Sequence, residues 1–240
     1  MGVTPYRHTA SGKKEQVERM FDNIAPKYDF MNGLLSAGIH KRWRKKAISL
    51  LREKKPKIIL DLATGTGDFA IEAIQLNPDK VIAADISEGM MKIGREKIRK
   101  KKLEGKISFQ KADSENLPFA SDSFDAITVG FGVRNFEDLL KGLQGMHRVL
   151  KPGGMAVILE FSKVTSFPMK QLYGFYFNFI TPALGKLFTS DRSAYTYLPD
   201  SVQAFPSGRD FELILQKAGF KDIRSKRLTF GIATIYLATK

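Results

Sequence analysis

The stretch "LDLATGTGDFA", from Leu60 to Ala70, begins as a hydrophobic strand and turns through two glycines into a helical pattern. Gly65, Gly67 and Ala70 fit the spacing G-x-G-x-x-G/A, in which the glycines bring the backbone close to a ligand and the small third residue lets helix and strand pack closely. Asp85 ends the next hydrophobic run about twenty residues later, where a carboxylate can bind the ribose hydroxyls of an adenosine group. An ordinary tight turn would share the glycines, but strand, turn, helix and spaced acid together favour nucleoside binding.

Short apolar runs alternate with amphipathic segments on both sides of this turn. We expect strands at 57–63, 80–86, 106–112, 124–130 and 154–161, and helices at 68–75, 87–102 and 137–150. Nearly continuous hydrophobic strands separated by helices are typical of a parallel sheet that is covered on both faces.

The C-terminal part of the chain changes this rhythm. A helical pattern at 209–220 is followed by two strand-like runs, 223–231 and 232–240, which lie too close together for the long crossover that parallel strands need. We therefore predict an α/β, Rossmann-like fold: a seven-stranded, mainly parallel sheet that ends in an antiparallel hairpin, with helices on both faces.

Two segments fall outside the alternation. Residues 15–50 are helical, aromatic and basic and are expected to form an N-terminal cap, and residues 163–206 are an insertion rich in Phe, Tyr and Pro on the substrate side. Both are long enough to cover a site at the edge of the sheet. Residues 1–14 have the composition of a frayed or disordered end, so we expect one domain over residues 15–240.

Composition narrows the class of protein. In 240 residues, 43% hydrophobic and 27% charged side chains lie in the ordinary globular range, which argues against wholesale disorder and against a multi-span membrane protein. The absence of cysteine excludes disulfides and thiolate sites, and His8, His40 and His147 have no metal-binding spacing, so we predict no metal.

Charge and the N-terminal sequence bear on partners and location. The first residues lack an apolar core of the length that a signal peptide needs, so a cytoplasmic location is expected. A net charge of +14 favours anionic partners, whether nucleic acid, acidic lipid headgroups or acidic small molecules. The sequence leaves open whether the chain is a monomer or a homodimer.

The next question is which nucleoside binds, because enzymes that use NAD share the glycine template. Asp61 lies just before the glycines, where an anion would sit poorly beside a pyrophosphate and well beside a cationic amino acid. S-adenosylmethionine has an ammonium and a sulfonium and no phosphate, and Asp113 ends the third run at a natural place to bind the adenine amino group. We predict S-adenosylmethionine as cofactor, with contacts from Asp61, Gly65, Thr66, Gly67, Asp85, Asp113, Ser114 and Gly130.

These features resemble a class I S-adenosylmethionine-dependent methyltransferase, and two longer motifs narrow the resemblance. "YDFMNGLLSAGIHKRW", Tyr28 to Trp43, and "RVLKPGGMAVILEFS", Arg148 to Ser162, are similar to the two signatures of the ubiquinone/menaquinone biosynthesis C-methyltransferase family. With "FGVRN" between them, the likeness runs from about Val17 to the C-terminus. The chain departs from general methyltransferase usage at Ala63, where another glycine is frequent, and Gly130 lies where some members have Ser.

The resemblance implies transfer of a methyl group to a ring carbon of a demethylated polyprenyl quinol, with demethylmenaquinol the commonest bacterial substrate. Such a site must align the methyl group, support a phenolate-like oxygen and accept the departing ring proton. We expect Gly130 and Gly132 to let cofactor and quinol approach the strand end, Phe131 to form a wall, and Arg134 and Asn135 to donate hydrogen bonds to the quinol oxygens.

Tyr28 and Asp68 complete the predicted catalytic residues, with Tyr28 bonding quinol or cofactor and Asp68 positioning a water that receives the proton. An acid in the first turn of a helix is also favoured by the helix dipole alone.

Other polar residues have simpler readings too. Arg134 could form an ion pair with Glu137 or Asp138 that merely caps the next helix. His40 and Trp43 could pack the cap onto the main domain, and Glu160 could be structural or could face the substrate.

The insertion and the cap suggest contact with lipid. Residues 167–188 are apolar and aromatic, but Lys170, Gln171 and Lys186 interrupt them, so they should not span a bilayer. They form either a core helix pair or a lid for an isoprenoid tail. With "KRWRKK" at 41–46, they predict transient, peripheral contact with the anionic inner face of the cell membrane.

Three other functions fit parts of the sequence. An RNA methyltransferase would suit the basic charge, but no Asn-Pro-Pro-Tyr-type motif follows the fourth strand, so we expect no nucleic-acid partner. An S-adenosylmethionine-binding scaffold of a quinone-biosynthesis complex would share the fold without turnover. A dehydrogenase is disfavoured by Asp61 and by both signatures.

Overall fold

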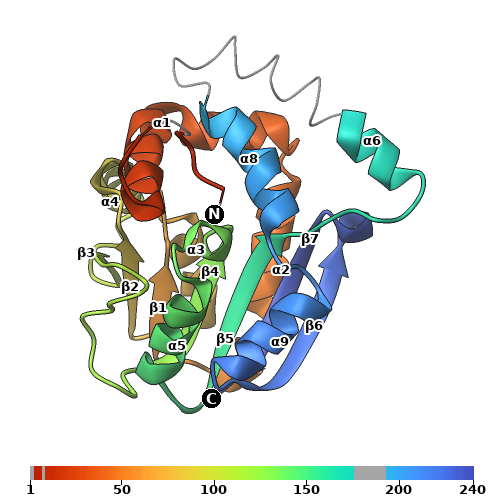
Figure 1. The fold of residues 1–240 in the computed structure, drawn as a ribbon. Helices are drawn as coiled ribbons and strands as arrows, with labels where there is room; N and C mark the ends of the chain where they lie inside the picture. The colour runs from red at the N-terminus through yellow and green to blue at the C-terminus, as the bar shows by residue number, and fades with distance from the viewer. Residues whose placement is uncertain (1–2, 7–8, 176–192) are drawn as a thin grey trace.

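A computed structural model of the chain describes residues 3–6, 9–175 and 193–240, which form a seven-stranded sheet in the order β3-β2-β1-β4-β5-β7-β6 (Figure 1). The strands are β1 (Ile58–Leu62), β2 (Lys80–Asp85), β3 (Ile107–Lys111), β4 (Phe124–Gly130), β5 (Leu150–Phe161), β6 (Lys221–Leu228) and β7 (Ala233–Thr239). Strands β1 to β5 pair in parallel, whereas β7 is antiparallel to both β5 and β6. The predicted parallel sheet with a C-terminal antiparallel hairpin is confirmed.

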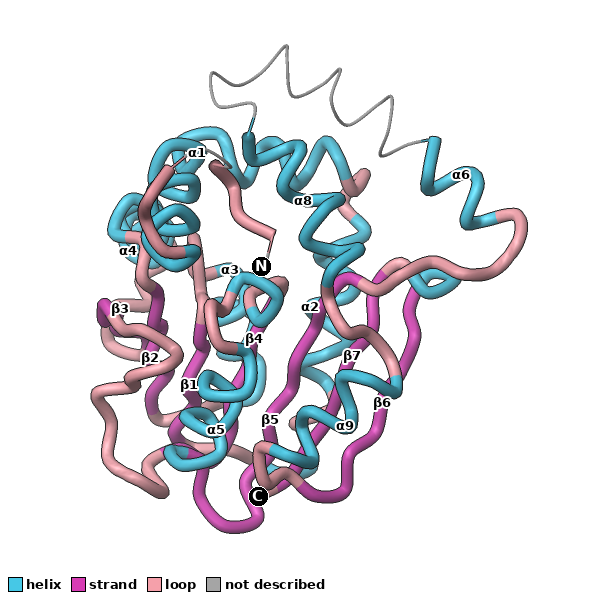
Figure 2. The backbone as a smooth tube through the Cα atoms, in the orientation of Figure 1, coloured by secondary structure: helices cyan, strands magenta, loops and turns pink. Residues whose placement is uncertain are grey.

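Helices cover both faces of the sheet, as the backbone trace shows (Figure 2). The described α-helices are α1 (Lys13–Leu35), α2 (Ile39–Ser49), α3 (Asp68–Ala73), α4 (Glu88–Lys100), α5 (Leu139–Val149), α6 (Met169–Phe175), α8 (Ser193–Ala204) and α9 (Arg209–Lys217). Short 3-10 turns are η1 (Arg52–Lys54), η2 (Ile74–Leu76), η3 (Val133–Asn135) and η5 (Thr229–Gly231). One apolar core contains buried residues of α5 and α9, and the other contains those of α2, α3 and α4.

The central strand β1 shows why the sequence gives this arrangement. Leu60 and Leu62 belong to the core under α5 and α9, whereas Ile59 belongs to the core under α2 and α3. A strand whose alternate side chains enter two cores must be hydrophobic on both faces, which is the pattern that the sequence has here.

Helices α1 and α8 lie across the ends of the parallel strands (Figure 1). Val17, Met20 and Met31 of α1 form a small apolar cluster with Tyr197 of α8. Polar contacts attach the other side of α1, because the Asp22 carboxylate accepts hydrogen bonds from the Ser87 hydroxyl at 2.6 Å and from the Gly89 amide at 2.9 Å. The cap is therefore fixed to the start of α4.

Some boundaries differ from the expected ones. Helix α1 begins at Lys13, and the Tyr6 amide, inside the segment predicted to fray, donates to Gln16 Oε1 at 2.9 Å. Strand β5 begins at Leu150 and not at 154, because residues before the Pro-Gly-Gly turn already pair with β4. The division into frayed end, cap and insertion stays a prediction.

The insertion is covered in part. It contains α6 and α8, whereas residues 176–192, which include most of the apolar stretch predicted to act as a lid or core helix pair, lie outside the described residues. Within the described parts of the chain, no helix is long and apolar enough to cross a membrane.

Candidate active site

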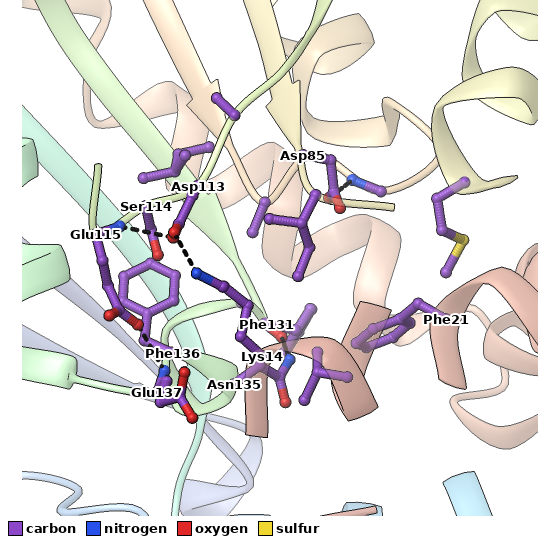
Figure 3. A pocket seen from close by; sticks show the side chains of 18 of the residues that line it. Lys14, Phe21, Asp85, Asp113, Ser114, Glu115, Phe131, Asn135, Phe136 and Glu137 are labelled. Carbon is purple, nitrogen blue, oxygen red and sulfur yellow. Dashed lines mark hydrogen bonds and ion pairs between the residues drawn. The ribbon is translucent and has the colours of Figure 1, made fainter. Parts of the chain in front are cut away.

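A narrow cavity of about 70 Å³ lies at the carboxyl ends of β1, β2 and β4, beneath α1 (Figure 3). The glycine turn contributes Ala63 and Gly65, and the neighbouring strand ends contribute Asp85 and Gly130. Parallel α/β sheets bind ligands at this edge, because the strand ends and the helix N-termini meet there.

Asp85 occupies the position predicted for a ribose-binding acid. Its Oδ2 accepts a hydrogen bond from the Gly65 amide at 2.7 Å, and its Oδ1 accepts one from the Ser87 amide at 2.9 Å. Burial raises the pKa of this carboxyl above its ordinary value. The two amides hold the carboxylate in one orientation at the cavity wall, as a residue that selects a diol requires.

Asp113 and Ser114 line the other end of the same cavity. The Asp113 carboxylate accepts a hydrogen bond from the Glu115 amide at 2.9 Å and forms an ion pair with Lys14 Nζ at 2.8 Å (Figure 3). Lys14 and Phe21 of α1 were not predicted to lie here. They lie outside both signature motifs, so nothing in their local sequence identified them.

Asp61 does not line this cavity, although we expected it to contact the cofactor. Its side chain is fully buried and accepts hydrogen bonds from the Thr64 hydroxyl and, at 2.7 Å, from the Thr128 hydroxyl. Burial raises its pKa to about 7. Asp61 therefore connects the glycine turn to β4, and its contact with the cofactor stays a prediction.

The glycine turn has the conformation that its sequence indicates. Gly65 and Gly67 both have positive φ, at 56° and 79°, where a side chain is disfavoured. A Cβ at Gly67 would also lie 3.0 Å from the Phe109 ring. Between them, the Thr66 hydroxyl donates to Asp29 Oδ1 of α1 at 2.7 Å, so this residue connects the turn to the cap.

A second, larger cavity of about 410 Å³ adjoins the first and is mainly apolar. The two share wall residues, namely Phe21, Tyr28, Ala63, Gly65, Gly130 and Phe131. Trp43, Phe131 and Phe161 form an aromatic wall, with ring centroids 4.5 Å apart for Phe131 and Phe161 and 6.3 Å apart for Trp43 and Phe131. A flat, apolar molecule can therefore lie directly beside the contents of the first cavity.

Arg134 lines the second cavity, but its partner is not the expected one. Its guanidinium forms a buried ion pair with Glu160 at 2.9 Å, and its Nε donates to the Ser201 hydroxyl at 3.3 Å. The nearby acids are engaged elsewhere, since Glu137 accepts the Lys13 amide and Asp138 caps α5. The alternative of an ion pair with Glu137 or Asp138 is therefore wrong.

Asn135 and Tyr28 flank the boundary between the cavities. Asn135 lines the first cavity and not the second, and its Oδ1 accepts a hydrogen bond from the Tyr197 hydroxyl at 3.1 Å. Tyr28 lines both, and burial raises the pKa of its phenol, so it stays protonated at neutral pH and can donate a hydrogen bond.

Asp68 lines the second cavity but is tied to two cations. It forms ion pairs with Lys97 and, at 2.8 Å, with Arg44. Burial alone would raise the pKa of Asp68, but Arg44 and Lys97 together hold it below its usual value. Both carboxylate oxygens of Asp68 are thus engaged by cations, and its role in positioning a proton-receiving water stays a prediction.

His40 and Trp43 do more than pack the cap onto the main domain. Trp43 is buried and donates to the Thr229 hydroxyl at 2.9 Å, as packing would require, yet both residues also line the second cavity. The sequence contained a signal for the cavity-lining position of His40. Polar residues recur there every four positions, and all of them line the second cavity, namely Tyr28, Asn32, Ser36 and His40.

Comparison with known proteins identifies the family. A family model described as the ubiE/COQ5 methyltransferase family matches residues 9–240. The chain belongs to the ubiE/COQ5 methyltransferase family. This methyltransferase is 53% identical to a demethylmenaquinone methyltransferase of Bacteroides fragilis over 239 residues, which cover 99% of this chain and 97% of the relative. It is 46% identical to a ubiquinone/menaquinone biosynthesis C-methyltransferase of Geobacter sulfurreducens, with coverage of 99% and 93%.

Solved structures of methyltransferases share the fold. A methyltransferase from Thermotoga maritima, described as dependent on S-adenosylmethionine, superposes with a TM-score of 0.65 at 18% identity, covering 92% of this chain and 98% of the other. Phosphoethanolamine N-methyltransferase 2 of Haemonchus contortus, solved with S-adenosyl-L-methionine, gives a TM-score of 0.58 at 17% identity and covers 81% and 52%. The predictions of family, fold class, enzyme class and S-adenosylmethionine as cofactor are confirmed.

Proposed function

We propose that this methyltransferase transfers a methyl group to a ring carbon of a demethylated polyprenyl quinol, with demethylmenaquinol as its main substrate. The observation that carries the proposal is the pair of adjoining cavities, one narrow and acidic and one wide and aromatic, which share the walls formed by Gly65, Gly130 and Phe131. Relatives named for demethylmenaquinone methylation, which match nearly the whole chain, support this substrate class.

The residues of the first cavity fit S-adenosylmethionine. The ordered Asp85 carboxylate suits a ribose diol, Asp113 and Ser114 suit an adenine edge, and Gly65 and Gly130 leave room for a ligand to approach the backbone. When bound, this cofactor supplies an electrophilic methyl group on a sulfonium. Asp61 would act indirectly, by fixing the turn that carries Gly65 and Thr66.

The second cavity has the properties that a quinol ring requires. Its aromatic wall excludes water from the reacting carbon, and Tyr28 offers a hydroxyl donor at the boundary between the cavities. Arg134, held in place by Glu160, offers guanidinium N–H donors that favour a phenolate-like oxygen. The remaining length of the cavity would receive the first part of an isoprenoid tail.

Membrane contact is part of this proposal, because the tail must come from a bilayer. Phe230 is 76% exposed at a turn between Thr229, which bonds Trp43, and Ile232, which lines the second cavity. Phe167 is 81% exposed just before α6, which contributes Met169 and Tyr173 to the same cavity. Exposed basic residues of α2, namely Lys41, Arg42, Lys45 and Lys46, would attract anionic headgroups.

Sedimentation with vesicles tests the membrane part. We expect Phe230→Ala to weaken binding to vesicles of anionic phospholipid at low salt, whereas Leu140→Ala, which removes a partly exposed side chain on α5, should not. Equal binding of both variants and the wild type would contradict the assigned surface.

A methyl-transfer assay tests the reaction. The purified chain, incubated with S-adenosylmethionine and short-chain demethylnaphthoquinol or the corresponding benzoquinol, should release S-adenosylhomocysteine together with the C-methylated quinol. Binding of the cofactor with no turnover on either ring would favour the scaffold alternative. Light scattering of the same preparation distinguishes a monomer from a homodimer.

A further inference from the structure

His40 is one of four cavity-lining polar residues that recur every four positions, together with Tyr28, Asn32 and Ser36. Tyr28 and Asn32 lie near the end of α1 and Ser36 follows it directly, whereas His40 lies in the first turn of α2. His40 is 7% exposed, so its environment is fixed by protein groups more than by bulk water.

The hydrogen bonds around Ser36 define which ring nitrogen of His40 carries the proton. The Ser36 hydroxyl donates to the Asn32 carbonyl oxygen at 2.6 Å, and this uses its only hydrogen. Ser36 Oγ also makes a short contact with His40 Nδ1, so Nδ1–H must be the donor in that contact. In neutral imidazole the other nitrogen, Nε2, then has a free lone pair.

The surroundings keep this imidazole neutral. Burial, followed by the positive charge of Arg44, lowers the pKa of His40 to about 4. Lys41 acts in the same direction, whereas Asp68 of α3 and Asp29 of α1 oppose it. At neutral pH His40 is therefore unprotonated. A base with this pKa can still accept the ring proton, because loss of that proton restores the aromatic ring and makes the methylated intermediate strongly acidic.

The other polar groups that line the second cavity are poorly suited to this role. Arg134 cannot lose its proton in a protein. Both carboxylate oxygens of Asp68 are occupied by the ion pairs with Arg44 and Lys97, and the raised pKa of Tyr28 keeps its phenol protonated. Among the described lining residues, His40 combines a basic lone pair with neutrality.

We propose that His40 is the catalytic base that removes the ring proton in the methylation, an inference that rests on the proposed function. As the bond between the methyl carbon and the ring carbon forms, the bond between methyl and sulfur breaks. That ring carbon then bears both a methyl group and a hydrogen. Its C–H bond breaks, the electron pair restores the aromatic ring, and the proton passes to His40 Nε2, which later releases it to water.

Kinetics of the full-length variants His40→Gln and His40→Ala test the role. We expect kcat to fall by about 10²–10⁴-fold, with unchanged S-adenosylmethionine affinity by calorimetry and an unchanged melting temperature. Quinol deuterated at the methylated carbon should give a primary isotope effect on kcat in His40→Gln that the wild type lacks, because proton loss becomes slow. Added imidazole should partly restore His40→Ala.

His147→Gln is the matched control, because His147 contacts Phe220 and lies in neither cavity. It should keep wild-type kcat and isotope effect. His40 variants that keep kcat within about threefold, or that lose activity with neither an isotope effect nor imidazole rescue, would overturn the role of His40 as base.

The ionisation state of His40 can be measured without any turnover. Nitrogen-15 NMR of histidine-labelled protein, assigned with His40→Gln, should show a neutral ring protonated on Nδ1 at pH 7. If the His40 ring is protonated on Nε2 or is charged at pH 7, His40 cannot be the base, whichever quinol is the methyl acceptor. A wild type inert towards every quinol would instead overturn the proposed function, and the NMR result would still decide the state of His40.

Discussion

Replacing Glu160 by Ala would leave the Arg134 guanidinium buried without its counter-charge. The Arg134 side chain is 7% exposed and the Glu160 side chain is fully buried. Glu160 accepts hydrogen bonds from Arg134 Nη1 at 2.9 Å, from the Arg134 amide at 3.3 Å and from the Phe161 amide at 2.8 Å. Both the charge balance and the position of η3 therefore depend on this one carboxylate.

The expected loss of stability is large. Removing one partner of a buried ion pair costs about 3–5 kcal/mol. A chain of this size loses about 2–4 °C in melting temperature per kcal/mol, so Glu160→Ala should melt about 6–20 °C below the wild type. An exposed pair gives the matched comparison, since Arg209→Ala, which removes the partner of Glu212, should cost less than about 1 kcal/mol.

The two halves of the pair should respond differently to pH. Burial raises the pKa of Glu160 above its ordinary value, so in Arg134→Ala this carboxyl can bind a proton and become neutral. Above the unfolded pKa of about 4.5, the folded variant then binds more protons than its unfolded chain, so its stability rises as the pH falls towards that value. Arginine cannot lose its proton, so in Glu160→Ala the buried charge of Arg134 cannot be neutralised by a change of pH.

Thermal melts of both single variants and of the double variant at pH 6 and pH 8, followed by circular dichroism, provide the measurement. The double variant should be more stable than the sum of the single losses predicts. Single variants that melt within a degree or two of the wild type, or that share one pH dependence, would refute the reasoning.

Three smaller effects are expected. Lys14→Gln frees the Asp113 carboxylate, so at low salt the Kd for S-adenosylmethionine should fall by up to about fivefold. Lys111→Gln, which breaks a similar ion pair with Glu18 of α1, should leave the Kd unchanged. Weaker binding by Lys14→Gln would mean that the Lys14 ammonium helps to hold the cofactor. Gly132→Ala should cost about 1–3 kcal/mol, because its Cβ would lie 2.5 Å from Ala63 Cβ, and the second change Ala63→Gly should restore most of the loss in denaturant melts. Because the pKa of His40 is about 4, a plot of kcat against pH should show no acidic limb near pH 6.5, and a limb there that disappears in His40→Gln would contradict the assigned ionisation.

Much of the fold was predictable, because it depends on local patterns. The alternation of hydrophobic runs with helices is enough to predict a parallel sheet, and the short spacing before β7 is enough to predict the reversed hairpin. The boundaries were less predictable. Strand β5 extends back to Leu150 because Leu150 pairs with Phe124 of β4, and that pairing is a tertiary contact invisible in a single sequence.

In the site, too, features set by local sequence were predictable and features set by tertiary contacts were not. Gly65 and Asp85 were found because turn and strand end are encoded within one βαβ unit, and the Gly65 amide does bond Asp85. Arg134 was predicted as a donor to the quinol, and the alternative from local sequence was an ion pair with an acid three or four residues away. The structure instead pairs it with Glu160 on the neighbouring strand β5. The surroundings of Asp61 were not predictable for a related reason, since the Thr128 hydroxyl that donates to its carboxylate comes from β4.

The residues that line the two cavities come from different parts of the chain, and this has a practical consequence. Side chains suited to the methyl donor lie at a strand end, as Asp85 does, or just after one, as Asp113 does. Tyr28, Asn32, Ser36 and His40 instead all belong to one short contiguous stretch. Exchange of that stretch for the corresponding residues of a relative with another aromatic preference should re-target the catalyst while donor affinity persists. Under the proposed function, the choice of ring would then depend mainly on residues 28–40.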